Sequence, residues 1–220
     1  MASLFKTVVF LFIVLPALLL LVLRFVPPPI TPLMVLRNAE GGGIDYRWRP
    51  LSQISDQMTR AVIAAEDARF CSHWGFDLKE TANAIEDWTT GARLRGASTI
   101  SMQTAKNVFL WPERNFLRKG LEAWLTPQVE IVWPKKRILE VYLNIAEMGP
   151  GIYGVEAAAQ HYFKKGADRL TPMEAALITA SLPNPRKWSP ARPTEYLSNR
   201  AAEILTRAAD IDPYISCLRE

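Results

Sequence analysis

Two short stretches of the sequence combine residue types that suit sugar transfer from a phosphate leaving group. Residues 65–75 contain Glu66 and Asp67, and residues 96–107 contain Lys106 near the start of an expected helix. A carboxylate can accept a proton from an attacking hydroxyl, while a cation and the amides at a helix start can stabilise a departing phosphate. Each stretch also has an ordinary interpretation, as a solvent-facing helix end and as a capped helix that carries a lysine.

The first stretch predicts a carboxylate with a raised pKa. Glu66 and Asp67 are expected in the last turn of a helix, where the carbonyl end repels negative charge. Phe70 and Trp74 add apolar surroundings, and both effects raise the pKa of a carboxyl group and make it a better base. We expect His73 to be a hydrogen-bonded structural residue. Since the chain has only two histidines, a histidine-based metal site is not expected.

The second stretch predicts a helix start that can face an anion. Gly96 permits a tight turn, and Ser98 or Thr99 can cap the helix. Thr99, Gln103 and Lys106 then follow at spacings of four and three residues, which places them on one face. A phosphate at this helix start would meet free backbone amides and, about one to two turns further on, the Lys106 ammonium.

An apolar segment near the N-terminus predicts where this chemistry is held. Residues 7–23 carry no charge, with Lys6 before them and Arg24 after them, and their length is near the lower limit for crossing a bilayer. We therefore expect a cytoplasmic stub at residues 1–6 and a single transmembrane anchor at residues 7–26. A cleaved signal peptide is the competing interpretation, but the apolar run is long for one and no small-residue cleavage pattern follows it.

The rest of the chain predicts a spacer followed by a mostly α-helical domain. Prolines and a run of three glycines predict an extended, partly flexible spacer over residues 27–50. Over residues 51–220 the apolar residues recur at helical spacing almost throughout, without a strong run of alternating strands. Thr171 and Glu174 flank a proline and predict a capped helix start.

Charge argues against one class of partner. The net charge of +4 over 220 residues is too small for a general nucleic-acid binder. Basic and aromatic residues are interleaved over residues 106–137, which suits an anionic membrane surface or equally a solvated helix. Arg118 and Glu122, spaced by four, predict an exposed ion pair. Cys71 and Cys217 are the only cysteines, and the sequence does not determine their state.

Five ordered blocks between residues 51 and 190 give a more specific signal. The blocks are Glu66-Asp67-x-x-Phe70-x-x-His73-x-Gly75, Gly96-x-Ser98-Thr99-Ile100-x-x-Gln103-x-x-Lys106-Asn107, Arg118-Lys119-x-x-Glu122, Ile138-Leu139-Glu140-x-Tyr142-Leu143-Asn144, and Glu174-Ala175-Ala176-Leu177 with Leu182-Pro183-Asn184-Pro185. On these blocks the chain resembles glycosyltransferase family 51, and within it the monofunctional peptidoglycan transglycosylases.

The resemblance implies a lysozyme-like helical domain that polymerises lipid II on the periplasmic face of a bacterial inner membrane. Glu66 would be the general base for the 4-hydroxyl of the acceptor N-acetylglucosamine, and Glu122 matches a second essential carboxylate. The attack would invert the anomeric carbon of the donor, form a β-1,4 link and release undecaprenyl pyrophosphate. The matching substrate-binding positions are Lys106 and Arg114 for the donor pyrophosphate, Arg118 and Lys119 in the same cleft, and Ser98, Thr99, Gln103, Asn107, Asp67 and His73.

The resemblance also implies partners and cofactors. The expected partners are lipid II, the growing lipid-linked glycan and the membrane, with other cell-wall synthesis or division proteins as candidates and no nucleic acid. A divalent cation, magnesium or manganese, often assists in this family, but the sequence assigns it no ligand residues. No organic cofactor is expected. Phe109, Trp111 and Phe116 are expected near the cleft at the membrane interface.

Two other functions stay open at this level. A muramidase or lytic transglycosylase would use a catalytic glutamate in a similar domain to cleave glycan, and an anchored scaffold would need no catalysis. Lys106, Arg114 and Lys119 favour synthesis, because a cleavage reaction has no phosphate to bind.

Overall fold

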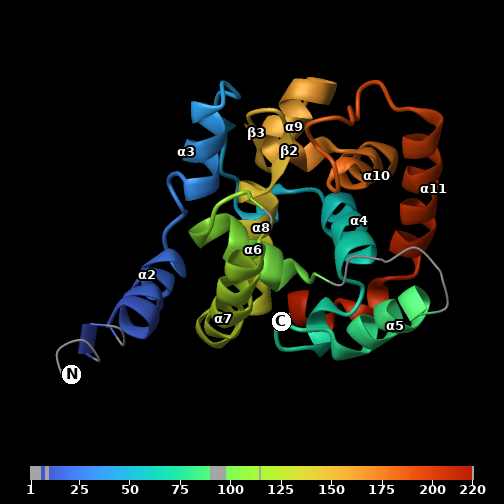
Figure 1. The fold of residues 1–220 in the computed structure, drawn as a ribbon. Helices are drawn as coiled ribbons and strands as arrows, with labels where there is room; N and C mark the ends of the chain where they lie inside the picture. Colours follow the sequence, from blue (N-terminus) through green and yellow to red (C-terminus); the bar gives the residue numbers. More distant parts are fainter. Residues whose placement is uncertain (1–5, 8–9, 90–97, 114, 220) are drawn as a thin grey trace.

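The computed structural model describes residues 6–7, 10–89, 98–113 and 115–219, and helices dominate them (Figure 1). The α-helices are α2 (Leu15–Leu23), α3 (Pro32–Ala39), α4 (Asp56–Glu66), α5 (Leu78–Thr89), α6 (Ile100–Phe109), α7 (Phe116–Val132), α8 (Lys135–Ile145), α9 (Gly154–Phe163), α10 (Pro172–Ser181) and α11 (Glu195–Ala209). The short helices are η1 (Phe10–Val14), η2 (Leu51–Gln53), η3 (Phe70–Ser72), η4 (Ala167–Arg169), η5 (Asp212–Tyr214) and η6 (Ser216–Leu218). The predicted mostly α-helical class is confirmed, whereas the likeness to lysozyme stays a prediction.

The helices pack as two groups around a common core. α4 packs against α10 and α11, while α6 packs against α7 and α8 (Figure 1). The largest fully buried side chains include Trp133, Tyr142, Tyr153 and Phe70. The predicted cap of α10 is present, because Thr171 and Glu174 form a capping box. This packing fixes the ends of α4 and α6, where the candidate site residues lie.

A small sheet joins the N-terminal part of the domain to its centre. The strands β1 (Asp45–Tyr46), β3 (Ile152–Tyr153) and β2 (Glu147–Gly149) lie in the order β1-β3-β2, with β1 parallel and β2 antiparallel to β3. Gly151 allows the close approach of this turn, because a Cβ there would lie 1.8 Å from the carbonyl oxygen of Gly42.

The prediction of an extended spacer over residues 27–50 is wrong for the residues that form α3 and β1. Thr31 caps α3 by accepting a hydrogen bond from the Met34 amide, and Pro32 occupies the first turn. Leu33 and Met34 are buried in the core, and α3 packs against α6. A helix-start signal and an apolar face therefore outweighed the proline density on which the prediction rested.

The predicted anchor region forms the short helix η1 and then α2. Among the described residues, no helix has the length and apolar character needed to cross a membrane. α2 packs against α7, and the indole of Trp133 donates a hydrogen bond of 2.7 Å to the carbonyl of the buried Leu20. Arg24 donates to the Val132 carbonyl at 2.6 Å. Residues 1–5 of the predicted stub lie outside the described residues.

A disulfide answers the question that the sequence left open about the cysteines. Cys71 in η3 is bonded to Cys217 in η6, across 146 residues of sequence. Arg60 on α4 reinforces the same junction, because its guanidinium donates to both carboxylate oxygens of Asp212 at 2.9 and 2.7 Å. The C-terminal segment is therefore fastened to the loop that follows α4.

Candidate active site

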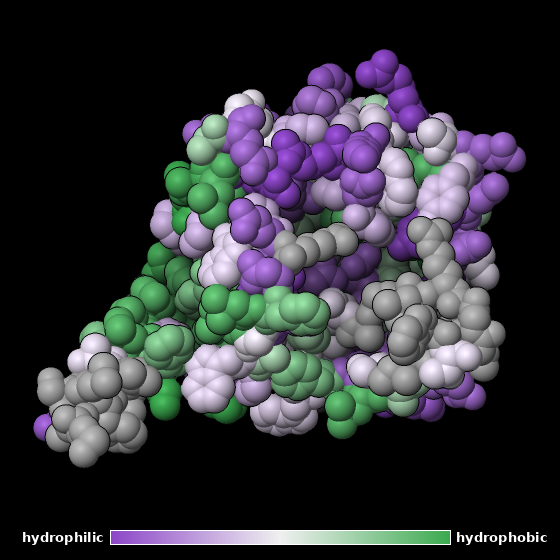
Figure 2. Space-filling view, in the orientation of Figure 1, coloured by the Kyte–Doolittle hydropathy of each residue, from purple (hydrophilic) through white to green (hydrophobic). Residues whose placement is uncertain are grey.

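A cleft of about 580 Å³ lies where α4 ends, α5 and α6 begin and α11 passes. Figure 2 shows hydrophilic side chains around a hollow near the middle of the face that it presents to the viewer. Among the residues predicted from the sequence, Glu66, Asp67, Ser98 and Thr99 line the cleft. The two chemically suggestive stretches thus meet at one cavity.

Glu66 is a partly buried carboxylate held by an amide. Its Oε2 accepts a hydrogen bond of 2.8 Å from Gln103 Nε2, and Gln103 Oε1 accepts one of 3.2 Å from the Tyr142 hydroxyl. Burial is the largest influence and raises the pKa of Glu66, while the Gln103 hydrogen bond and the charges of Arg200 and Lys106 oppose this shift. The direction of the predicted pKa shift is confirmed.

Asp67 connects the end of α4 to the start of α6. The Gly75 amide donates to His73 Nδ1 at 3.1 Å, so the ring hydrogen is on Nε2, which donates to Asp67 Oδ1 at 2.8 Å. Asp67 Oδ2 accepts from the Ile100 amide at 3.0 Å. Thr99 caps α6 and donates its hydroxyl hydrogen to the Gly75 carbonyl at 2.6 Å. This buried network sets the position of the neighbouring Glu66, and His73 has the structural role expected of it.

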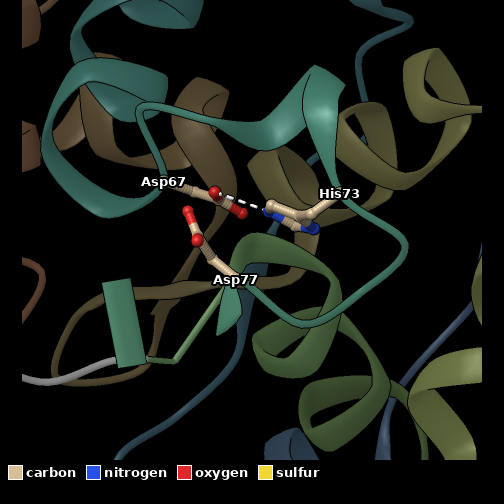
Figure 3. A group of neighbouring side chains, drawn as sticks. All are labelled: Asp67, His73 and Asp77. Carbon is tan, nitrogen blue, oxygen red and sulfur yellow. Dashed lines mark hydrogen bonds and ion pairs between the residues drawn. The ribbon is translucent and has the colours of Figure 1, made fainter. Parts of the chain in front are cut away.

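Asp67, His73 and Asp77 also form the candidate group for a divalent cation. Their ligand atoms lie within 4.8 Å of one another, and the two carboxylates converge beside the ring (Figure 3). The donor set does not fit a metal ion as it is arranged, because His73 Nε2 carries a hydrogen. Asp77 Oδ1 already accepts from the Arg69 guanidinium at 3.0 Å and from the Glu80 amide at 2.9 Å. We therefore derive no reaction step from a cation at this cluster.

Lys106 on α6 interacts electrostatically with two carboxylates. Its charge lowers the pKa of Glu66 and of Glu147 on β2, although burial raises both and is the larger influence. Asn107, the next residue, is buried within the packing of α6. Arg114, the other predicted pyrophosphate residue, lies outside the described residues.

Glu122 accepts hydrogen bonds from two basic side chains near the cleft. Its carboxylate is buried and accepts hydrogen bonds of 2.7 Å from Arg118 Nη1 and from Lys119 Nζ. The pair with Arg118, which the sequence predicted as solvent-exposed, is buried. Lys119 Nζ also donates to Ser98 Oγ at 3.2 Å, so it links Glu122 to the lining of the cleft.

Comparison with known proteins places the chain in a family. Residues 35–209 match the family model described as transglycosylase. The chain belongs to the transglycosylase family. Proteins called "Biosynthetic peptidoglycan transglycosylase" are similar to it over most of their length. The one from Caulobacter vibrioides is 53% identical over 189 residues, 86% of this chain and 82% of that protein. The one from Rhodospirillum centenum is 55% identical over 198 residues, 89% of this chain and 86% of that protein.

Sequence reasoning missed the α11 side of this transglycosylase cleft. Tyr196, Arg200, Glu203 and Arg207 line it, at spacings of four, three and four residues. That spacing on an amphipathic helix was the available signal, but it cannot say which cavity a polar face meets. Trp74, which the sequence predicted as shielding for Glu66, is instead 75% exposed.

Proposed function

We propose that this chain is a peptidoglycan glycosyltransferase that polymerises lipid II, with Glu66 as the general base. One observation carries the proposal: a carboxylate whose pKa is raised by burial lines a cleft within electrostatic reach of Lys106. A base with a raised pKa accepts a proton more readily in the transition state, and a nearby cation stabilises a departing phosphate. Membership of the transglycosylase family and the names of the relatives support peptidoglycan transglycosylase activity.

In the proposed reaction the 4-hydroxyl oxygen of the acceptor N-acetylglucosamine attacks the anomeric carbon of the donor. The hydroxyl proton passes to Glu66, and the bond to undecaprenyl pyrophosphate breaks, which inverts the anomeric carbon and forms a β-1,4 link. Gln103 fixes the orientation of the carboxylate through Oε2. Lys106 is proposed to stabilise the negative charge of the leaving pyrophosphate, together with Arg114.

Glu122 acts in this proposal through the two cations that it holds. A buried carboxylate that accepts from both Arg118 and Lys119 fixes their positions. Lys119 reaches Ser98 on the cleft wall, so its ammonium is placed to meet an anionic part of the substrate. Thr99, Gln103, Asp67 and His73 then serve mainly to hold the helix start and the base in place. Asn107 stays a proposed substrate-binding residue.

We propose that the N-terminal segment attaches the domain to the inner membrane as a single-pass anchor, with the cleft on the periplasmic face. Apolar side chains gather over α2 and its neighbours (Figure 2). On α7, which packs against α2, further exposed apolar side chains are Phe116, which is 98% exposed, Leu117 and Ile131. Phe109 and Trp111 pack against the core, so Phe116 is the better candidate for interface contact. The Cys71–Cys217 disulfide suits an oxidising compartment.

The remaining predicted partners and cofactors enter only as part of this proposal. A magnesium or manganese ion would act on the pyrophosphate, with no ligand assigned in the chain, and no organic cofactor is needed. Lipid II and the growing glycan are the substrates. Other cell-wall proteins stay candidate partners, and nucleic acid does not enter the proposal.

The test uses purified lipid II in detergent with the full chain and with Glu66→Gln. The wild type should form glycan polymer, and Glu66→Gln should lose a factor on the order of a hundred or more in rate, because proton transfer is lost. Release of fragments from isolated sacculi without polymer formation would favour the lytic alternative. Full polymerisation by Glu66→Gln would contradict the assignment of the base.

A further inference from the structure

The cleft that holds Glu66 continues along α11, where two aromatic side chains form part of its wall. Trp188 and Tyr196 both line the cleft. Their ring centroids lie 5.5 Å apart, and the ring planes are tilted by 52°. Trp188 is partly buried and packs against the hydrophobic core, whereas Tyr196 is 54% exposed. Trp188 is therefore a core-packed support for an exposed ring.

Groups of both charge signs surround this aromatic pair. Arg200, Glu203 and Arg207 follow Tyr196 on the same face of α11, and the rest of the lining includes Asp77 and Glu80. Such a wall offers hydrogen-bond donors and acceptors together, without an excess of positive charge for an anion. Mixed polar groups beside an exposed ring suit an uncharged ligand that has hydroxyl groups and an apolar C–H face.

We propose that Tyr196, supported by Trp188, is a saccharide platform that binds one unit of a β-1,4-linked chain of N-acetylated sugars. The same cavity contains Tyr196 and Glu66, so a sugar bound to this ring belongs to a chain that reaches the reacting end. The inference rests on the proposed function for the nature of the ligand. The platform holds the glycan at a fixed position along the cleft and takes no part in proton transfer.

A binding experiment tests the platform without lipid or pyrophosphate. The probe is chitotetraose, four β-1,4-linked N-acetylglucosamine units, titrated calorimetrically into the full chain in detergent. The wild type should bind it saturably, Tyr196→Phe should bind equally well, and Tyr196→Ala should bind about three- to tenfold more weakly, as expected for loss of one aromatic contact. The absence of saturable binding by the wild type, or equal binding by Tyr196→Ala, would overturn the proposal.

The chain offers a matched control. Tyr214 on η5 has a similar exposure, 58%, and lies outside the lining of this cleft. Tyr214→Ala should therefore bind chitotetraose as the wild type does. If both alanine variants weaken binding equally, the effect is not specific to the cleft and the platform is rejected.

Kinetics with lipid II separate this proposal from the proposed function. Tyr196→Ala should raise KM by a similar factor of about three to ten while kcat and the thermal midpoint stay unchanged. If the wild type polymerises lipid II and Tyr196→Ala keeps its KM, the platform fails alone. If the wild type forms no polymer but chitotetraose binding still requires Tyr196, the proposed function fails and the platform stands.

Discussion

Glu66 combines two properties that conflict in a folded protein. Burial makes its ionised form costly, yet a general base must be ionised before it can accept a proton. Gln103 eases this conflict by donating a hydrogen bond to the carboxylate. Burial raises the pKa of Glu66, while this hydrogen bond and the charges of Arg200 and Lys106 lower it, so their balance should set the pH at which the enzyme becomes active.

The first prediction concerns Gln103. The pKa of Glu66 is raised and the Gln103 hydrogen bond opposes that shift, so Gln103→Ala should raise the pKa further. Because activity appears as the base loses its proton, the acid limb of the kcat/KM profile should move to higher pH. Activity well above the limb should change less than activity below it. Polymerisation rates measured over a pH series would check this, and a limb that stays in place or moves to lower pH would contradict it.

The second prediction is that removing the charge at Glu66 stabilises the fold. A carboxyl group whose folded pKa is raised binds its proton more tightly when folded, so stability falls as pH rises from its unfolded pKa through its folded pKa. Glu66→Gln should therefore raise the thermal midpoint at neutral pH and have little effect well below pH 4. Each kcal/mol of relief corresponds to about 2–4 °C for a chain of this size. Equal midpoints of the variant and wild type at neutral pH would show that burial of the charge costs little.

At the scale of elements, two basic side chains of α7, Arg118 and Lys119, donate hydrogen bonds to the Glu122 carboxylate but differ in their exposure to solvent. Arg118 is buried, whereas the Lys119 side chain is about half exposed. Removing Glu122 leaves Arg118 buried without its carboxylate, so Glu122→Ala should cost about 3–5 kcal/mol of stability. Lys119→Ala should cost only about 0–1 kcal/mol but should raise KM, because a cation beside Ser98 is lost. Denaturant unfolding and lipid II kinetics on both variants would check this third prediction, and a large loss of stability in Lys119→Ala would contradict it.

The fourth prediction concerns α3 and β1. A chain that starts at residue 51, where the sequence predicted the domain to begin, lacks the buried Leu33 and Met34 and leaves β3 without its partner strand β1. Loss of these two buried apolar side chains costs a few kcal/mol each, so this chain should unfold at much lower temperature than one that starts at residue 27. Calorimetry on the two chains would check it. Equal thermal midpoints would show that α3 is dispensable.

Local signals in the sequence predicted elements well, and long-range packing was harder to predict. The capping box at Thr171 follows from neighbouring residues and was anticipated. The direction of the Glu66 pKa shift was anticipated as well, although Trp74, one of the residues on which that prediction rested, is exposed. The role of α3 was missed because a proline-rich stretch reads as extended unless its apolar face has a known partner. The α11 wall of the cleft, including Arg200, depends on contacts far apart in sequence, and helical periodicity alone cannot assign them.

At the scale of the whole molecule, the chain is closed into a loop by its disulfide. Cys71 lies in sequence between Asp67 and Asp77, which both line the cleft, and Cys217 lies in the C-terminal helix η6. The disulfide therefore links the C-terminal segment to the loop that forms one wall of the cleft. Arg60 and Asp212 bridge the same two regions without a covalent bond. The closing segment therefore bears on both global stability and the loop that positions Glu66.

The fifth prediction separates those two contributions. A bond across 146 residues removes much conformational freedom from the unfolded chain, so Cys71→Ser with Cys217→Ser should cost about 2–5 kcal/mol of stability. At temperatures well below unfolding the ion pair and the buried Ile211 and Ile215 should keep the segment in place, and kcat should stay near that of the wild type. Thermal unfolding and lipid II polymerisation at low temperature measure the two effects separately. If kcat falls while the protein is still fully folded, the disulfide also holds the catalytic loop in its working geometry, and the same loss should then appear when the wild type is reduced.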